Sequence, residues 1–200
     1  MFLQYLSSDP IFYLRVVTIL IISISLHELG HGIAAIFQGD DTPVIKGHMT
    51  MNPLVHMGIH SIFFLLLAGI AWGQMPVNPS KFRHPKWGSI LVSAAGPLTN
   101  IALGMLAMLV INLSLYFDWN KIVSLEFFYI IARFNFVLCL FNLIPIPPLD
   151  GYHVASEIIP EMKALGRSKI GLALFMILFI SGIGGELFSL ADIIVRALII

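Results

Sequence analysis

The chain has 200 residues, of which 58% are hydrophobic and only 11% are charged. Soluble proteins carry about 25% charged residues, and so few charges could not cover this much apolar surface in a soluble fold. Eleven basic and eleven acidic residues cancel, so no overall positive field recruits nucleic acid. The single cysteine, Cys139, excludes an intrachain disulfide and a thiolate zinc cluster. The composition predicts an integral membrane protein.

Long apolar stretches divide the chain into segments suited to membrane helices. Asp9 and Pro10 are typical of an N-cap and a first helical residue, so the first helix is expected to begin there. We expect an all-α polytopic membrane protein with about four to five transmembrane helices, folded as one domain over 1–200. Its core is expected at 10–158 and a C-terminal helical segment at 168–200. The apolar stretches are 10–37, 87–117, 122–149 and 170–200.

A polar region and a short apolar run separate the first two long stretches. Residues 44–51 alternate in the manner of a short hairpin, whose edge could pair with an extended substrate. The run at 61–73 has about 13 residues, too few for a relaxed membrane span. We therefore expect a short re-entrant or β-hairpin insert after the first helix.

An H-E-x-x-H motif, His27 to His31, lies in the first predicted helix. Residues i and i+4 are about 40° apart around a helix, so both imidazoles face one point. This geometry suits two zinc ligands, and Glu28 beside them can accept a proton from the attacking water. The alternative is a polar patch packed inside a bundle, which would place three costly ionisable groups in a membrane helix without a purpose.

A catalytic zinc is expected to have a third protein ligand and an open position for water. Asp150 is the candidate, because the prolines within 145–148 break the third long helix and Gly151 lets the chain turn. Asp150 could instead act only as the N-cap of a following helix. Beside the two histidines, and without thiolates, ligation is favoured. The residues thus predict one Zn²⁺ per chain, bound by His27, His31 and Asp150.

Three motifs closely resemble those of the site-2 protease family of intramembrane metalloproteases (peptidase M50), and two shorter elements resemble its compact prokaryotic branch without PDZ or CBS domains. The motifs are HELGH at 27–31, AGPLTN at 95–100 and NLIPIPPLDG at 142–151, with MNPLVH at 51–56 and VNP at 77–79. The resemblance implies zinc ligation by the residues above, Glu28 as general base, and Asn142 in substrate positioning or oxyanion stabilisation. It also implies regulated intramembrane proteolysis of a membrane-anchored protein substrate.

The positions of the motifs and of the basic residues predict the topology. His31 and Asp150 can meet on one metal only if the first and third long helices run parallel, which requires the insert to turn back. Seven basic residues then share one side of the bilayer and Lys121 lies on the other; a full crossing would give six against two. The positive-inside rule predicts a multi-pass plasma-membrane protein with its N-terminus outside and its site toward the cytoplasm.

Several other polar residues are weaker candidates. Asn100 and His153 are candidates for contact with the metal ligands, although Asn100 could equally serve in packing. His48 and His56 flank the expected hairpin, where they could gate the site or remain ordinary loop histidines. Arg133 is a costly mid-helix charge, expected to pair with Glu126 two turns earlier.

Two rival functions remain open for this sequence. Intramembrane His and Asp residues also mark ion pathways, so a metal-ion transporter would explain the ligands. It would not explain Glu28 inside an H-E-x-x-H motif. A catalytically inactive relative that only binds membrane helices is the other rival, and the complete set of ligands and base argues against it.

Overall fold

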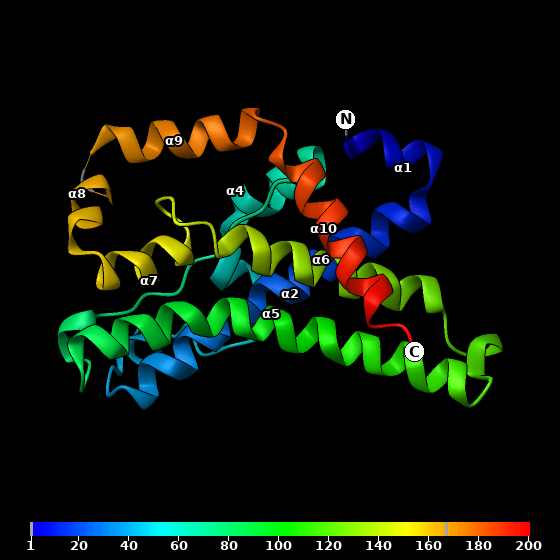
Figure 1. The fold of residues 1–200 in the computed structure, drawn as a ribbon, viewed down its shortest axis with the longest axis horizontal. Coiled ribbons are helices and arrows are strands. Elements are labelled where there is room, and N and C mark those ends of the chain that lie inside the picture. Colours follow the sequence, from blue (N-terminus) through cyan, green and yellow to red (C-terminus); the bar gives the residue numbers. More distant parts are fainter. Residues whose placement is uncertain (1, 167) are drawn as a thin grey trace.

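The computed structural model describes residues 2–166 and 168–200. Its framework is three long helices, α2 (Pro10–Phe37), α5 (Pro85–Tyr116) and α6 (Leu125–Asn142). Figure 1 shows α2 and α6 running in the same direction and α5 in the opposite one, as the metal motifs require. The short elements are η1 (Phe2–Gln4), α1 (Tyr5–Ser8), α3 (Thr42–Ile45), η2 (Pro79–Lys81), η3 (Trp119–Lys121), η4 (Pro160–Met162) and α8 (Lys163–Gly166).

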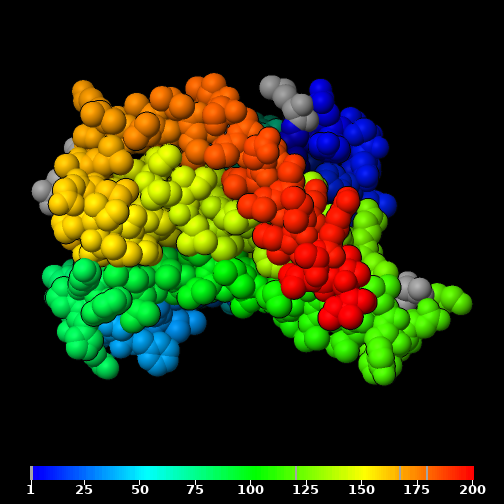
Figure 2. Space-filling view, in the orientation of Figure 1, coloured from blue at the N-terminus to red at the C-terminus, as the bar shows by residue number. Residues whose placement is uncertain are grey.

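The described residues form helices and no strand, which confirms the all-α membrane class. Within them, α2, α5 and α6 are long and apolar enough to cross a bilayer. A bent pair, α9 (Lys169–Ile180) and α10 (Ile183–Ala197), would form a fourth span if its two halves, inclined at 62°, act together. In Figure 2, α6 lies between this pair and α5.

Local sequence signals set the ends of the long helices. The Asp9 carboxylate accepts a hydrogen bond from the amide of Phe12, and Pro10 begins α2, as predicted. The third long helix is shorter than the predicted 122–149, because α6 ends at Asn142. The prolines that follow have no N–H to donate and force their preceding residues out of the helical conformation. The chain therefore unwinds before α7 (Asp150–Ile158) begins.

The expected hairpin at 44–51 is wrong: the structure has α3, a turn, and then α4 (Pro53–Ala68). Prolines at the first turns of α3 and α4 favour helix starts, and the Asn52 side chain caps α4 by accepting from the amide of Leu54. The apolar run that begins at residue 61 lies in the part of α4 beyond a kink at Gly58, and the helix ends at Ala68 with Gly69 as its left-handed C-cap.

The insert turns back, as the parallel-helix argument requires. After α4, the irregular return segment (residues 70–78) runs back along it. The Ser61 hydroxyl bonds to both main-chain groups of Trp72, and the Gln74 amide donates to the His56 carbonyl. Farther along, the Asn78 amide donates to Asp40, just after α2, at 2.6 Å. Both ends of the insert thus lie near the C-terminal end of α2 (Figure 1).

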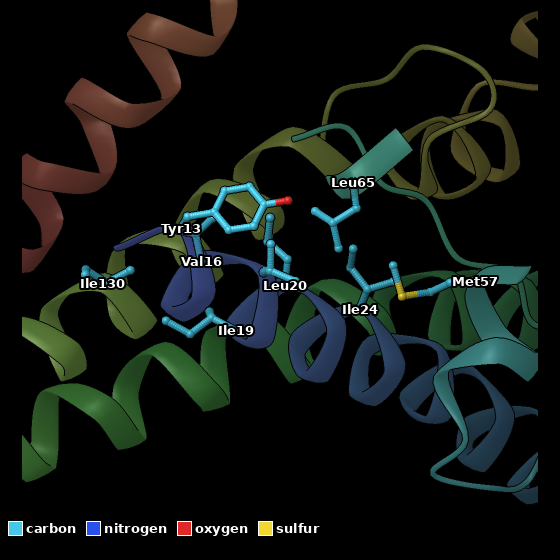
Figure 3. Packing of buried hydrophobic residues seen from close by; sticks show 9 residues of the cluster. Tyr13, Val16, Ile19, Leu20, Ile24, Met57, Leu65 and Ile130 are labelled. Atoms are coloured by element: carbon cyan, nitrogen blue, oxygen red, sulfur yellow. The ribbon is translucent and has the colours of Figure 1, made fainter. Parts of the chain in front are cut away.

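The main hydrophobic cluster holds α4 against α2. Figure 3 shows Tyr13, Leu20 and Ile24 of α2 facing Leu65 and Met57 of α4. The Tyr13 hydroxyl donates to the Leu66 carbonyl at 2.8 Å, which satisfies the one polar atom of that ring. This packing fixes the helix that carries the metal motif relative to the insert.

An ion pair joins α10 to α6. Arg133 lies 2.6 Å (Nε–Oδ1) and 2.8 Å (Nη2–Oδ2) from the Asp192 carboxylate, and its guanidinium lies over the Phe188 ring. The expected pairing of Arg133 with Glu126 is therefore wrong, since Glu126 pairs with Arg15 at 3.0 Å. Glu126 lies seven positions before Arg133, two turns away along α6, whereas Asp192 reaches Arg133 from the neighbouring helix α10.

Candidate metal centre

His27, His31 and Asp150 converge on one point. The two histidines lie one turn apart on α2, and Asp150 is the first residue of α7. The Nε2 atoms of His27 and His31 are 3.0 Å apart, and the Asp150 carboxylate oxygens lie 3.1 and 3.4 Å from them. All three donor atoms fall within 4.8 Å of one another, the one such group of three or more His, Cys, Asp or Glu ligands in the described chain.

The hydrogen bonds of the two imidazoles leave both Nε2 atoms available to a metal. The Nδ1 of His31 lies 2.6 Å from the Val92 carbonyl oxygen, which can only accept, so this nitrogen carries the hydrogen. The Nδ1 of His27 lies 2.6 Å from Asn100 Oδ1. Two lone pairs and a carboxylate then face each other, an arrangement that a cation stabilises. Nitrogen and oxygen donors in this number suit Zn²⁺ with an open position.

Close backbone approach makes room for the ligands. A Cβ atom at Gly96 of α5 would lie 2.4 Å from the Nε2 atoms of both histidines. A Cβ at Gly151 would lie 2.1 Å from the Leu143 carbonyl oxygen. Gly96 therefore lets α5 pack directly against the two imidazoles, and Gly151 lets the start of α7 pack against the unwound segment before it.

Glu28 is buried beside the ligands and faces the return segment. A Cβ at Gly73 would lie 2.4 Å from Glu28 Oε1, so the backbone at Gly73 runs directly past the carboxylate. The metal ligands and Glu28 share a cavity of about 1170 Å³. Apolar side chains such as Phe141, Phe175 and Met176 line much of it. The site therefore combines a possible base with a mainly apolar chamber.

The other predicted residues take different places. Asn100 contacts His27 directly, as above. Asn142 lines the cavity and donates to the Leu138 carbonyl. His153 also lines the cavity, and no hydrogen bond in the described chain joins it to the metal ligands. His56 is fully buried, its Nε2 2.7 Å from the Thr50 carbonyl oxygen, while the His48 ring lies 6.3 Å from it; neither belongs to the metal group.

Sequence reasoning missed three buried polar residues, Asn135, Ser23 and Asp40. Asn135 of α6 accepts a hydrogen bond from Asn100, and its own amide donates to Ser23 of α2. A buried asparagine in a membrane helix is itself a signal, because an unpartnered amide there is costly. The third omission is Asp40, fully buried at the end of the insert, where it accepts from the amides of Thr42 and Asn78.

Comparisons with known proteins identify the family of this chain. The model of peptidase family M50 matches residues 15–119 and 117–181. YwhC of Bacillus subtilis (strain 168), named as a zinc metalloprotease, is 34% identical over 174 residues, covering 82% of this chain and 80% of its own. Rip2 of Mycobacterium tuberculosis (strain H37Rv), also so named, is 30% identical, covering 80% and 64%. The zinc metalloprotease MJ0392 of Methanocaldococcus jannaschii is 29% identical, covering 86% and 44%. No solved structure matches the chain.

Proposed function

The chain belongs to peptidase family M50 and is a zinc metalloprotease of the membrane, and from this premise we propose that it hydrolyses a peptide bond of a membrane-anchored protein within or at the edge of the bilayer. The observation that carries the proposal is the location of the ligands: His27 and His31 lie on a helix long enough to span, and share one mainly apolar cavity with Glu28.

The residues divide the chemistry between them. Zinc, when bound by His27, His31 and Asp150, supplies Lewis acidity that activates water and polarises a carbonyl. Glu28 accepts the proton of the attacking water and returns it to the leaving amine, as general base and then general acid. Asn142, on the wall of the same cavity, is proposed to donate to the substrate carbonyl oxygen.

A membrane helix hides its carbonyls in internal hydrogen bonds, so a substrate must unwind before attack. The return segment, rather than the hairpin first expected, is suited to receive the unwound chain. Its Trp72, Gln74 and Asn78 amides are bound to the insert. In the described hydrogen bonds the amides of Gly73 and Val77 have no acceptor, and both residues line the cavity. They can therefore pair with an extended substrate.

Orientation follows from charge. With the insert turning back, seven of the eight basic residues outside the predicted apolar stretches are expected on the metal side of the bilayer, against Lys121 on the other side. The positive-inside rule then supports a plasma-membrane protein with its N-terminus outside and its metal site on the cytoplasmic side. Cysteine substitutions at Lys46 and Lys121, labelled from each side of intact cells, test this orientation.

Zinc content and zinc flux together test the proposal. Purified wild type should hold about one zinc per chain; Asp150→Ala should lose it, and Glu28→Gln should keep it. Dye-labelled single-span peptides in proteoliposomes should be cleaved by the wild type and not by Glu28→Gln. The transporter alternative predicts zinc uptake that survives Glu28→Gln, and folded wild type without zinc would leave only the helix-binding alternative.

A further inference from the structure

A chain of buried hydrogen bonds runs from the metal ligand His27 on α2 through α5 and α6 and back to α2. His27 Nδ1 meets Asn100 Oδ1 of α5 at 2.6 Å, and Asn100 Nδ2 donates to Asn135 Oδ1 of α6 at 3.0 Å. Asn135 Nδ2 donates to Ser23 Oγ at 3.0 Å, one turn before His27 on α2. Both asparagines are fully buried and Ser23 is 3% exposed. The chain leaves α2 at His27 and returns to it at Ser23.

One member of this chain fixes the direction of all the others. Asn135 Nδ2 also donates to the Ile131 carbonyl at 2.9 Å, and a carbonyl can only accept. The amide nitrogen of Asn135 is therefore turned toward Ile131 and Ser23, which leaves its oxygen facing Asn100. Asn100 must then present its nitrogen to Asn135 and its oxygen to His27. An oxygen facing Nδ1 requires a hydrogen on Nδ1, so in the neutral imidazole that binds a metal the lone pair is on Nε2.

We propose that Asn135 is a positioning residue of the metal site, which acts through Asn100 to hold His27 in the tautomer whose Nε2 lone pair faces Asp150 and His31. Without Asn135, the Asn100 amide has no partner to fix its orientation and can turn its nitrogen toward His27. The wrong nitrogen of the imidazole would then carry the hydrogen. This inference rests on the proposed zinc site and adds a residue that touches neither metal nor substrate.

The magnitude follows from what such partners contribute elsewhere. Groups that orient a metal-bound histidine typically change metal affinity by about 10- to 100-fold when removed. We expect Asn135→Leu to raise the zinc Kd, measured by chelator competition in detergent, by about that factor. Asn112→Leu is the matched control, because Asn112 of α5 bonds to the Leu198 carbonyl and not to the site. It should leave the zinc Kd unchanged.

A double-mutant cycle separates positioning from general packing. An aspartate at position 100 presents an oxygen to His27 whichever way it turns, so Asn100→Asp should make His27 independent of Asn135. Asn135→Leu should then weaken zinc binding in the wild-type background and cause no further weakening on top of Asn100→Asp, because a carboxylate at position 100 has no hydrogen to donate to Asn135 Oδ1. An equal loss in both backgrounds would show that Asn135 only packs, and the proposal would be wrong.

The outcomes keep this inference apart from the proposed function. Wild type that binds no zinc overturns both. Wild type that binds zinc, with an Asn135→Leu variant of unchanged Kd, overturns only the positioning role. A ¹⁵N spectrum of the metal-free protein gives a second readout: the His27 resonances should report hydrogen on Nδ1 in wild type and a mixture of tautomers in Asn135→Leu. An unchanged tautomer in the variant contradicts the proposal whatever its stability.

Discussion

A single methyl group at Gly96 should disrupt the metal centre. The Cβ of an alanine there would lie 2.4 Å from the Nε2 atoms of both His27 and His31, where ordinary contact begins at 3.4 Å. One element must therefore move by about 1 Å. Moving α5 disturbs its packing on α2, and moving an imidazole breaks a 2.6 Å hydrogen bond at its Nδ1. Either response misplaces the zinc ligands.

The size of the effect can be bounded. Alanine favours a helix over glycine by about 0.5–1 kcal/mol, whereas overpacking a filled interior costs about 1–3 kcal/mol. If the imidazoles yield, a cost of this size corresponds to a zinc Kd about 5- to 150-fold higher. Chelator competition on the detergent-purified variant measures it, beside a thermal melting curve.

Gly104→Ala on the same helix provides the control. Its Cβ would meet the Phe136 ring at 2.8 Å, so it overpacks α5 against α6 instead of the metal ligands. It should lower the melting temperature while zinc affinity stays at the wild-type value. A Gly96→Ala protein that binds zinc as tightly as wild type would refute the assignment of both Nε2 atoms to a site against Gly96.

Two further predictions concern the insert. Gly73→Ala places a methyl 2.4 Å from Glu28 Oε1, so it should retain zinc and lose peptide cleavage; loss of zinc would contradict this separation. Burial raises the pKa of Asp40, but the hydrogen bonds it accepts outweigh burial and hold that pKa below 3.8. The stabilisation of the fold by ionised Asp40 is therefore complete above pH 3.8, the ordinary pKa of the group, and is lost as the pH falls through the lowered pKa of the folded protein. The Asp40→Asn variant should have a lower melting temperature than wild type at neutral pH and should lose less stability on acidification. The control Asp41→Asn, at an exposed position, should have nearly the wild-type melting temperature. Equal melting temperatures for the two variants at neutral pH would contradict the role of Asp40.

Much of the fold follows from local sequence signals. Asp9 and Pro10 mark the start of α2, and the prolines after Asn142 mark where α6 must stop, because caps and missing N–H groups act on neighbouring residues. The spacing of His27 and His31 brings both imidazoles to one face through helix periodicity alone. The region at 44–51 was mispredicted because alternation of side chains is a weak signal beside two prolines that start helices.

Only the tertiary structure decided which distant groups meet. Nothing near Arg133 in the sequence indicates Asp192 as its partner, and nothing near His27 indicates Asn135. These pairs depend on how far each helix is rotated about its axis and where it crosses its neighbours, which the packing of many side chains determines together. The sequence by itself predicted that this chain binds a metal and which residue types would hold it. The packed helices decided the supporting contacts, because a membrane interior leaves buried polar groups no water and so requires each to find a partner on another helix.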